Sequence, residues 1–265
     1  MLPSYTAIMK TLVAFQNITL IDGTGAAPLP DATVAVRDGR IVYAGKARKW
    51  QPSLEEDIIN LDFGGKFLLP GLIDCHVHLS GSGEPDSRFD EANDGAMAIK
   101  MLGNARKNLA AGITTVRDLG GWNEIEFSVR RSIQAGEFTG PHMVLAGRFV
   151  SISESGVDHY RGMYRIADGV EEVRKAAREQ IMHGADLVKL GVTGAVLVRD
   201  GVPGATYFNS DEIRVAVEEA AKFGKRVAAH AHGIDGIRKA VQAGVHSIEH
   251  GTYLHKGDRC GTTQT

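Results

Sequence analysis

The pattern of apolar and polar positions divides the chain into two parts. Up to residue 68, apolar residues occur in short β-type runs with little helical periodicity, at 11–21, 33–37, 40–44, 58–61 and 66–69. Asp38 and Gly39 stand between two of these runs, and this pair is a strong hairpin signal. We therefore expect residues 1–68 to form a small all-β module resembling a β-sandwich.

From residue 69 onward, strand patterns alternate with helical patterns. We expect strands at 71–79, 114–119, 143–149, 187–192, 227–231 and 247–251, and helices at 92–111, 123–135, 170–183, 211–223 and 234–243. Asn209 and Glu212 have the spacing of a capping box at the start of the fourth helix. Strand–helix units in series predict an α/β fold, either a parallel sheet or a (β/α) barrel.

The number of strand patterns is smaller than a complete barrel requires. A TIM-type (β/α) barrel has eight strands and takes about 250 residues, whereas residues 69–253 contain strand patterns for about six of these eight. We expect an incomplete barrel in the form of a six-strand parallel arc, followed by an irregular tail over 254–265. The last strand would then be an open edge, and such edges favour pairing with another chain, so we expect a homo-oligomer.

Composition narrows the class of protein. The chain has 30 Lys and Arg against 32 Asp and Glu, a net charge of −2, which gives no basic field for nucleic acid. No apolar run approaches the roughly 18 residues of a membrane span. The two cysteines, Cys75 and Cys260, lie far apart and do not form a disulfide framework. We expect a cytoplasmic globular protein without nucleic-acid or membrane partners.

Two histidines lie close together on the first strand that follows residue 69. Side chains alternate along a strand, so Asp74, His76 and His78 share one face. Histidines two residues apart can point both imidazoles at one metal ion. Alone, the pair favours two ordinary strand histidines, and the long apolar run that precedes it is what strengthens the metal interpretation.

Lys189 lies in the middle of an apolar strand, where a charged amine is costly unless it is paired or modified. Burial near cations lowers the pKa of a lysine, and a neutral amine can react with carbon dioxide to give a carbamate. A carbamate is in effect a carboxylate on a long arm that can bridge two metal ions. Alternatively, the buried stem of Lys189 carries its ammonium group to water. The sequence leaves both open.

Two later strands each carry a histidine that could bind metal. His230 and His250 lie on successive parallel strands, which can present them at similar height, and imidazole is a good zinc ligand. His232 shares the face of His230, so we expect it behind the ligands or in contact with substrate.

Substrate contacts in barrels usually come from the loops that follow the strands. The loop after the third strand carries two candidates, His159 and Tyr160, and Arg148 and Tyr207 are two more.

Together the candidate ligands are more specific than any one of them. The set His76, His78, Lys189, His230 and His250 resembles the metal-dependent amidohydrolase superfamily, whose barrel begins with a strand ending in His-x-His. The run Leu-Leu-Pro-Gly-Leu-Ile-Asp-Cys-His-Val-His at 68–78 looks like that signature, and Asp-Gly-Arg-Ile-Val at 38–42 looks like part of the preceding β-module. The resemblance covers nearly all of 11–253. It is greatest to the imidazolonepropionase-like and Xaa-dipeptidase-like branch, with a carboxylated lysine on strand four and Ile-Glu-His-Gly on strand six.

The resemblance implies two divalent metal ions, which we expect to be zinc. His76 and His78 would bind the first ion, His230 and His250 the second, and Lys189, as a carbamate, would bridge them. Lys189 and His230 would be catalytic, and a metal-bound hydroxide would attack the carbonyl of a small-molecule or dipeptide substrate. The implied activity is hydrolysis of amide, peptide or cyclic amide C–N bonds.

Two alternatives remain open. The family places an aspartate at the end of strand eight, and we find no counterpart to it here, so we expect a truncated chain. Such a fragment could bind metal without turnover. The second alternative is a mononuclear deaminase that uses His76, His78 and His230, but that branch has no use for a carbamate on Lys189.

Overall fold

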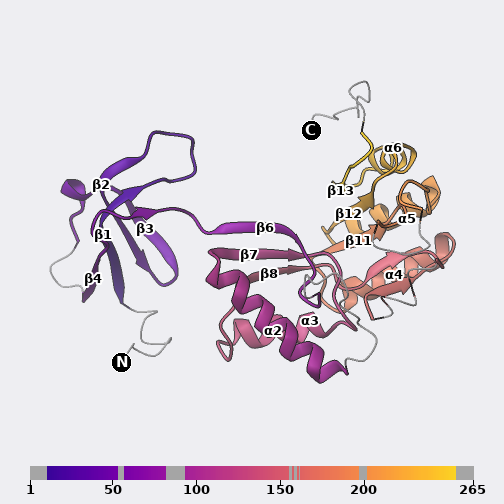
Figure 1. The fold of residues 1–265 in the computed structure, drawn as a ribbon, viewed down its shortest axis with the longest axis horizontal. Helices are drawn as coiled ribbons and strands as arrows, with labels where there is room; N and C mark the ends of the chain where they lie inside the picture. Colours follow the sequence, from indigo (N-terminus) through magenta and orange to yellow (C-terminus); the bar gives the residue numbers. More distant parts are fainter. Residues whose placement is uncertain are drawn as a thin grey trace. The chain divides into compact units, whose positions relative to one another are not determined.

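The computed structural model describes residues 11–52, 57–81, 93–154, 157, 160, 162–196 and 202–254. Contacts divide the chain into two compact units, Met1–Gly71 and Leu72–Thr265 (Figure 1). Within the described ranges, no helix is both long enough and apolar enough to cross a membrane.

The first unit is built around one sheet. Its strands are β1 (Leu12–Leu20), β2 (Leu29–Arg37), β3 (Arg40–Lys46), β4 (Ile58–Asp62) and β5 (Phe67–Leu68), and a short 3-10 helix, η1, spans Ala47–Lys49. β1, β2 and β3 pair antiparallel, while β4 and β5 pair parallel to β1. Asp38 and Gly39 have φ of 50° and 71° in the β2–β3 turn, the backbone that a tight hairpin between twisted strands requires.

The second unit is α/β with two parallel sheets. The first sheet has the order β6-β7-β8 and the second the order β10-β9-β11-β12-β13. The strands are β6 (Leu72–Val77), β7 (Ile113–Asp118), β8 (His142–Leu145), β9 (Phe149–Ser151), β10 (Tyr164–Ile166), β11 (Leu187–Gly191), β12 (Arg226–Ala231) and β13 (Ser247–His250). The helices are α2 (Asp94–Ala110), α3 (Ile125–Gln134), α4 (Val170–Met182), α5 (Ser210–Lys222) and α6 (Ile234–Gln242). The described strands do not close into a barrel.

The strand expected at 143–149 is divided in two, and this expectation was wrong. β8 ends at Leu145 and β9 begins at Phe149, with Gly147 between them at φ +76°. The side chain of Gln180 accepts the backbone N–H of Arg148 at 2.7 Å, so this backbone bonds to a helix and not to a strand. The single six-strand arc is therefore replaced by two sheets. β10 is a further strand that the sequence pattern did not indicate.

The helix starting after Asn209 confirms the expected capping box. The Asn209 side chain accepts the backbone N–H groups of Asp211 and Glu212 at 3.0 Å each, and Glu212 accepts the N–H of Asn209 at 2.8 Å. α5 begins where these bonds satisfy its first amide groups. Its apolar face, including Ile213 and Ala216, packs on β11 and β12.

Strand alternation separates the helix-facing side of the second sheet from its opposite face. Val188 and Leu190 of β11, together with Val227 and Ala229 of β12, belong to the apolar core formed with the helices. Residues of the other parity, such as Lys189, therefore face away from the helices. This opposite face carries the polar residues described next.

Candidate metal centre

His230 and His232 lie at the end of β12, on the face opposite the helices. Ala229 and Ala231 of the same strand pack in the helix-facing core, which directs the two histidines to the other side. Both are buried, with 7% and 3% of their surface exposed. The backbone N–H of His232 donates to the Thr193 hydroxyl at 2.9 Å, which fixes the chain just beyond the strand.

His250 reaches the same place through an unusual backbone. Ile248 packs against the helix-facing core, so simple alternation would turn His250 toward the helices as well. Its φ is 75°, in the left-handed region that residues other than glycine seldom adopt. This conformation lets His250 join the histidines of β12. Such backbone strain is concentrated at functional sites.

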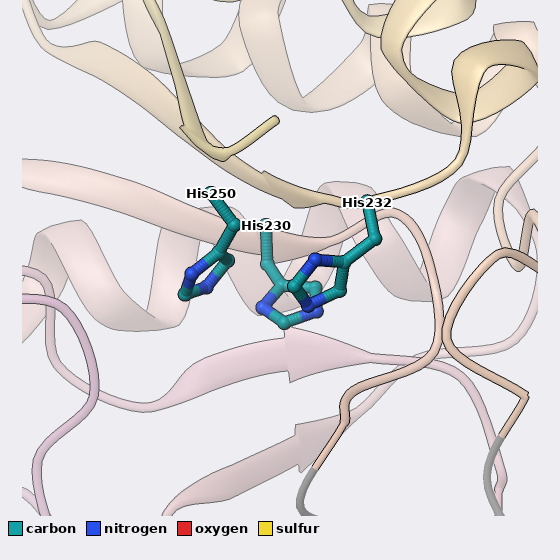
Figure 2. A group of neighbouring side chains, drawn as sticks. All are labelled: His230, His232 and His250. Atoms are coloured by element: carbon teal, nitrogen blue, oxygen red, sulfur yellow. The ribbon is translucent and has the colours of Figure 1, made fainter. Parts of the chain in front are cut away.

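The three histidines form one cluster, which Figure 2 shows with the rings converging. The ligand atoms of His230, His232 and His250 all lie within 4.8 Å of one another. The ring centroids are 4.5 Å apart for His230 and His250, and 4.7 Å for His232 and His250. His76 continues the series, since its ring lies 5.0 Å from that of His250 and 5.3 Å from that of His78. The structure thus brings together all four predicted histidine ligands, and adds His232 to them.

In His78, His230 and His232, the hydrogen bonds leave one nitrogen of each ring available for a cation. A carbonyl oxygen only accepts, so the ring nitrogen that contacts it carries the hydrogen. His78 Nδ1 lies 3.1 Å from the Gly120 oxygen, which leaves Nε2 with its lone pair. His230 Nε2 lies 3.3 Å from the Gly194 oxygen, which leaves Nδ1. Nε2 of His232 is buried without a hydrogen-bond partner among the described residues.

Three of these histidines, His78, His230 and His250, are held neutral, as metal ligation requires. Burial is the main cause: it lowers the pKa of His78 and of His230 to about 3, and the pKa of His250 to about 4. Neutral imidazoles with buried, unengaged nitrogens are the ligand set that zinc and similar ions prefer. The residues present therefore fit a divalent metal.

Lys189 is fully buried on β11, with 0% of its surface exposed. The alternative in which its amine reaches water is therefore excluded. Burial lowers the pKa of Lys189 to about 7, so a large part of the amine is neutral at physiological pH. Its Nζ lies 5.5 Å from the centre of the Phe149 ring, whose own centre is 5.9 Å from that of His230.

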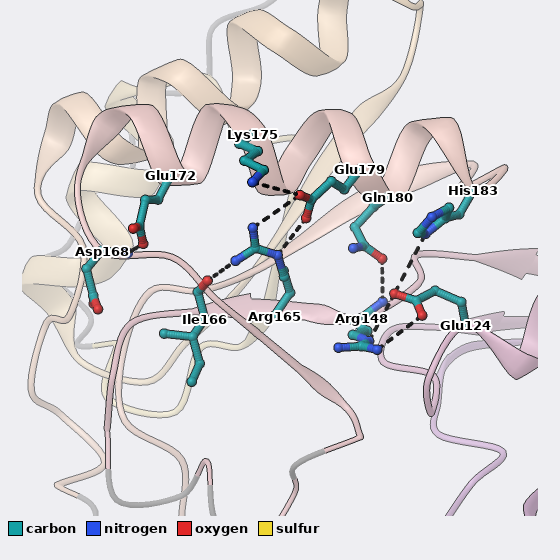
Figure 3. Close-up of polar contacts among 10 residues, drawn as sticks. All are labelled: Glu124, Arg148, Arg165, Ile166, Asp168, Glu172, Lys175, Glu179, Gln180 and His183. Carbon is teal, nitrogen blue, oxygen red and sulfur yellow. Dashed lines mark hydrogen bonds and ion pairs between the residues drawn. The ribbon is translucent and has the colours of Figure 1, made fainter. Parts of the chain in front are cut away.

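Three of the four predicted substrate-contact residues have contacts within the described structure. The Arg148 Nε atom lies 2.9 Å from the Glu124 carboxylate in an ion pair that Figure 3 shows beside α4. Tyr160 stacks on Tyr164 with ring centroids 6.1 Å apart. Tyr207 donates its backbone N–H to Val192 at 2.8 Å, and burial raises the pKa of its phenol. His159 lies outside the described residues. A substrate role for these four stays a prediction.

Sequence reasoning missed a buried ion pair beside the cluster. The Glu249 carboxylate lies 2.7 Å from Arg117 Nη2 and 3.0 Å from His76 Nδ1. The available signal was a charged residue inside the strand that ends in His250, on the parity opposite Ile248. Arg117 could have been found in the same way, as a charge within β7.

Comparison with known proteins places this cluster in context. The sequence profile described as the amidohydrolase family matches residues 67–264. Ochratoxinase from Aspergillus niger is 32% identical over 276 residues, covering 92% of this chain and 55% of that protein. Imidazolonepropionase from a Methylobacterium species is 38% identical over 79 residues, covering 29% of this chain and 19% of that protein.

Solved structures give the same result. The crystal structure of the A. niger ochratoxinase superposes with a TM-score of 0.81 at 28% identity, covering 93% of this chain and 61% of that one. A prolidase complexed with N-methylphosphonate-L-proline superposes with a TM-score of 0.81 at 29% identity, covering 92% and 62%. The chain thus spans a little over half the length of these relatives.

Proposed function

The chain belongs to the amidohydrolase family, and from that membership we propose that it acts in a metal-dependent hydrolase of C–N bonds. One observation carries the proposal. Five histidines and a buried lysine gather on one face of the strands. The buried histidines are already neutral, so each can bind a metal ion without first losing a proton. We further propose that the two parallel sheets are part of a TIM-type barrel.

The proposed ligands divide between two zinc ions. His76 and His78 would hold the first ion, and His230 and His250 the second. His232 offers the second ion a further nitrogen, because its Nε2 is buried without a partner in the described part of the chain. Divalent ions in such sites act as Lewis acids that polarise a carbonyl group and acidify water.

Lys189 is proposed to carry a carbamate that links the two ions. Its neutral amine nitrogen would attack the carbon of dissolved carbon dioxide, forming the N–C bond while one N–H proton passes to water. Complete burial supports this, because burial favours the neutral amine and lowers the pKa of Lys189 to about 7. The resulting negative charge would be offset by the bound ions.

The substrate is proposed to be an amide, with dipeptides and N-acyl amino acids as the first classes to test. Similarity to a prolidase bound to N-methylphosphonate-L-proline and to ochratoxinase supports this choice. Cyclic amides follow from the similarity to imidazolonepropionase.

The test combines metal analysis with hydrolysis of a substrate panel. Purified protein is analysed for metal by elemental analysis, and the release of free amine is followed with dipeptides, N-acyl amino acids and lactams. We expect two ions per chain and hydrolysis that a chelator abolishes and zinc restores. His230→Asn should lose one ion, whereas His142→Gln, at an exposed histidine on β8, should retain both.

Other outcomes separate the alternatives. Metal binding without hydrolysis of any substrate would favour a metal-binding chain without turnover. A single ion together with release of ammonia from an aminated ring would favour a mononuclear deaminase. Absence of both metal and C–N hydrolysis would overturn the proposal.

A further inference from the structure

The two strands that carry His76 and Glu249 stand at the edges of different sheets. β6 is the terminal strand of the first sheet and β13 the terminal strand of the second. Even so, the Glu249 Oε2 atom lies 3.0 Å from His76 Nδ1, a contact between residues 173 positions apart. The Glu249 side chain is only 7% exposed, so water competes little for this carboxylate.

The other oxygen of Glu249 is occupied from the opposite side. Oε1 accepts from Arg117 Nη2 at 2.7 Å and from the Ser247 hydroxyl at 2.8 Å. Arg117 is itself fixed, because its Nε donates at 2.6 Å to the backbone oxygen of Cys75, next to His76. One carboxylate oxygen of Glu249 therefore accepts hydrogen bonds from Arg117 and Ser247, while the other contacts the imidazole of His76.

These contacts determine which ring nitrogen of His76 carries the hydrogen. An ionised carboxylate only accepts, so Nδ1 must donate to it, and Nε2 keeps its lone pair. We propose that Glu249 is a positioning residue that holds His76 in the tautomer able to ligate metal through Nε2. The ligand role rests on the proposed function, while the tautomer stands on the contact alone. Carboxylates behind ligating histidines commonly act in this way.

The isosteric change Glu249→Gln tests this because it should invert the tautomer. The guanidinium of Arg117 only donates hydrogen bonds, so it selects the amide oxygen of the new side chain. The amide NH₂ group must then face His76 Nδ1, which can receive it only as an acceptor. The hydrogen of His76 moves to Nε2, and the lone pair needed for metal is lost. A side chain that merely ties the strands together would not have this effect.

The tautomer can be read without any metal. The full chain is labelled with ¹⁵N-histidine and stripped of metal, and long-range ¹H–¹⁵N correlation spectra distinguish Nδ1–H from Nε2–H. The His76 signals are assigned by their disappearance in His76→Gln. We expect Nδ1–H in the wild type and in the control Ser247→Ala. That control removes the hydroxyl that contacts Oε1 and Arg117 Nη1 but keeps the contacts of Glu249 with Arg117 Nη2 and His76. We expect Nε2–H in Glu249→Gln.

Zinc titration then measures the consequence. Glu249→Gln should weaken zinc binding by about 10–100-fold, while Ser247→Ala should stay close to the wild type. Nε2–H in the wild type, or Nδ1–H in a folded Glu249→Gln, would overturn the inference. The wild-type spectrum decides the matter even where the variant does not fold. A switched tautomer in a protein that binds no zinc would instead refute the proposed function and leave the positioning of His76 intact.

Discussion

Glu126 gives the sharpest test of the electrostatics in this fold. It lies in the first turn of α3 with 0% of its surface exposed, and no other described residue offers its carboxyl oxygens a hydrogen bond. The carboxyl group packs against Gly121, where an added Cβ would lie 1.9 Å from the carboxyl carbon. Burial, and next the nearby charge of Asp118, raise the pKa of Glu126 to about 8.

This shift makes the protein less stable as the pH rises. In the unfolded chain the carboxyl group has its ordinary pKa of 4.5, so between 4.5 and about 8 the folded state binds the extra proton. The free energy of unfolding must fall over that window. Since one pKa unit corresponds to about 1.4 kcal/mol, the penalty is roughly 3 kcal/mol at pH 7 and under about 1 kcal/mol at pH 5.

Glu126→Gln removes the titration while keeping the shape of the side chain. We expect the variant to gain about 2–3 kcal/mol on the wild type between pH 5 and pH 7. Urea unfolding of the metal-free protein, followed by circular dichroism at several pH values, measures the difference. The other ionisable groups are the same in both proteins, so their contribution to the difference cancels.

Glu137→Gln is the matched control, since Glu137 is exposed just beyond the same helix. Its effect should stay within about 0.5 kcal/mol at every pH, as for most surface substitutions. If the difference between Glu126→Gln and the wild type did not change between pH 5 and pH 7, the carboxyl group would not be held neutral. The argument from burial would then be wrong.

Three further predictions concern Lys189, the buried carboxylate of Glu219, and the removal of metal. Lys189→Ala should lose the second metal ion in elemental analysis, and short carboxylic acids should partly restore it; full metal content without added acid would show that the lysine is only structural. Glu219, with its side chain 1% exposed, is bonded by Arg178, Lys222 and Arg174, which hold its pKa at about 2. The stabilisation that the Glu219 carboxylate provides is therefore present above pH 4.5 and lost as the pH falls toward 2. Glu219→Gln should lower the free energy of unfolding by about 2 kcal/mol at pH 7, after allowance for screening by water, and by less in acid. An equal cost at both pH values would contradict this. Removal of metal by a chelator should lower the unfolding temperature, and zinc at about 100 times its Kd should return about 2.7 kcal/mol; an unchanged calorimetric transition would argue against a metal centre.

The sequence by itself determined much of the local structure and pointed to most of the residues proposed as ligands. The hairpin at Asp38-Gly39 and the capping box at Asn209 depend on residues a few positions apart, and so their patterns were sufficient. The shared face of His76 and His78 depends only on strand alternation. Lys189 stood out because a charge within an apolar strand needs an explanation wherever that strand lies.

Tertiary structure decided everything that depends on distant contacts. Whether the amine of Lys189 reaches water was fixed by the layers packed around β11, and these buried it completely. The strand expected at 143–149 is divided at Gly147. The side chain of Gln180 on α4 accepts the backbone N–H of Arg148, which a continuous strand would have used for pairing. The φ of 75° at His250 reversed the face that alternation assigned to it.

The contact between Glu249 and His76 is the clearest example of the limit. Each residue has an ordinary place on its own strand, and nothing within a few positions of either predicts the other across 173 residues. Periodicity tells which face a side chain takes, because it reflects the geometry of one strand. Which side chains meet across that face depends on how separate strands are packed, and only the folded chain determines that.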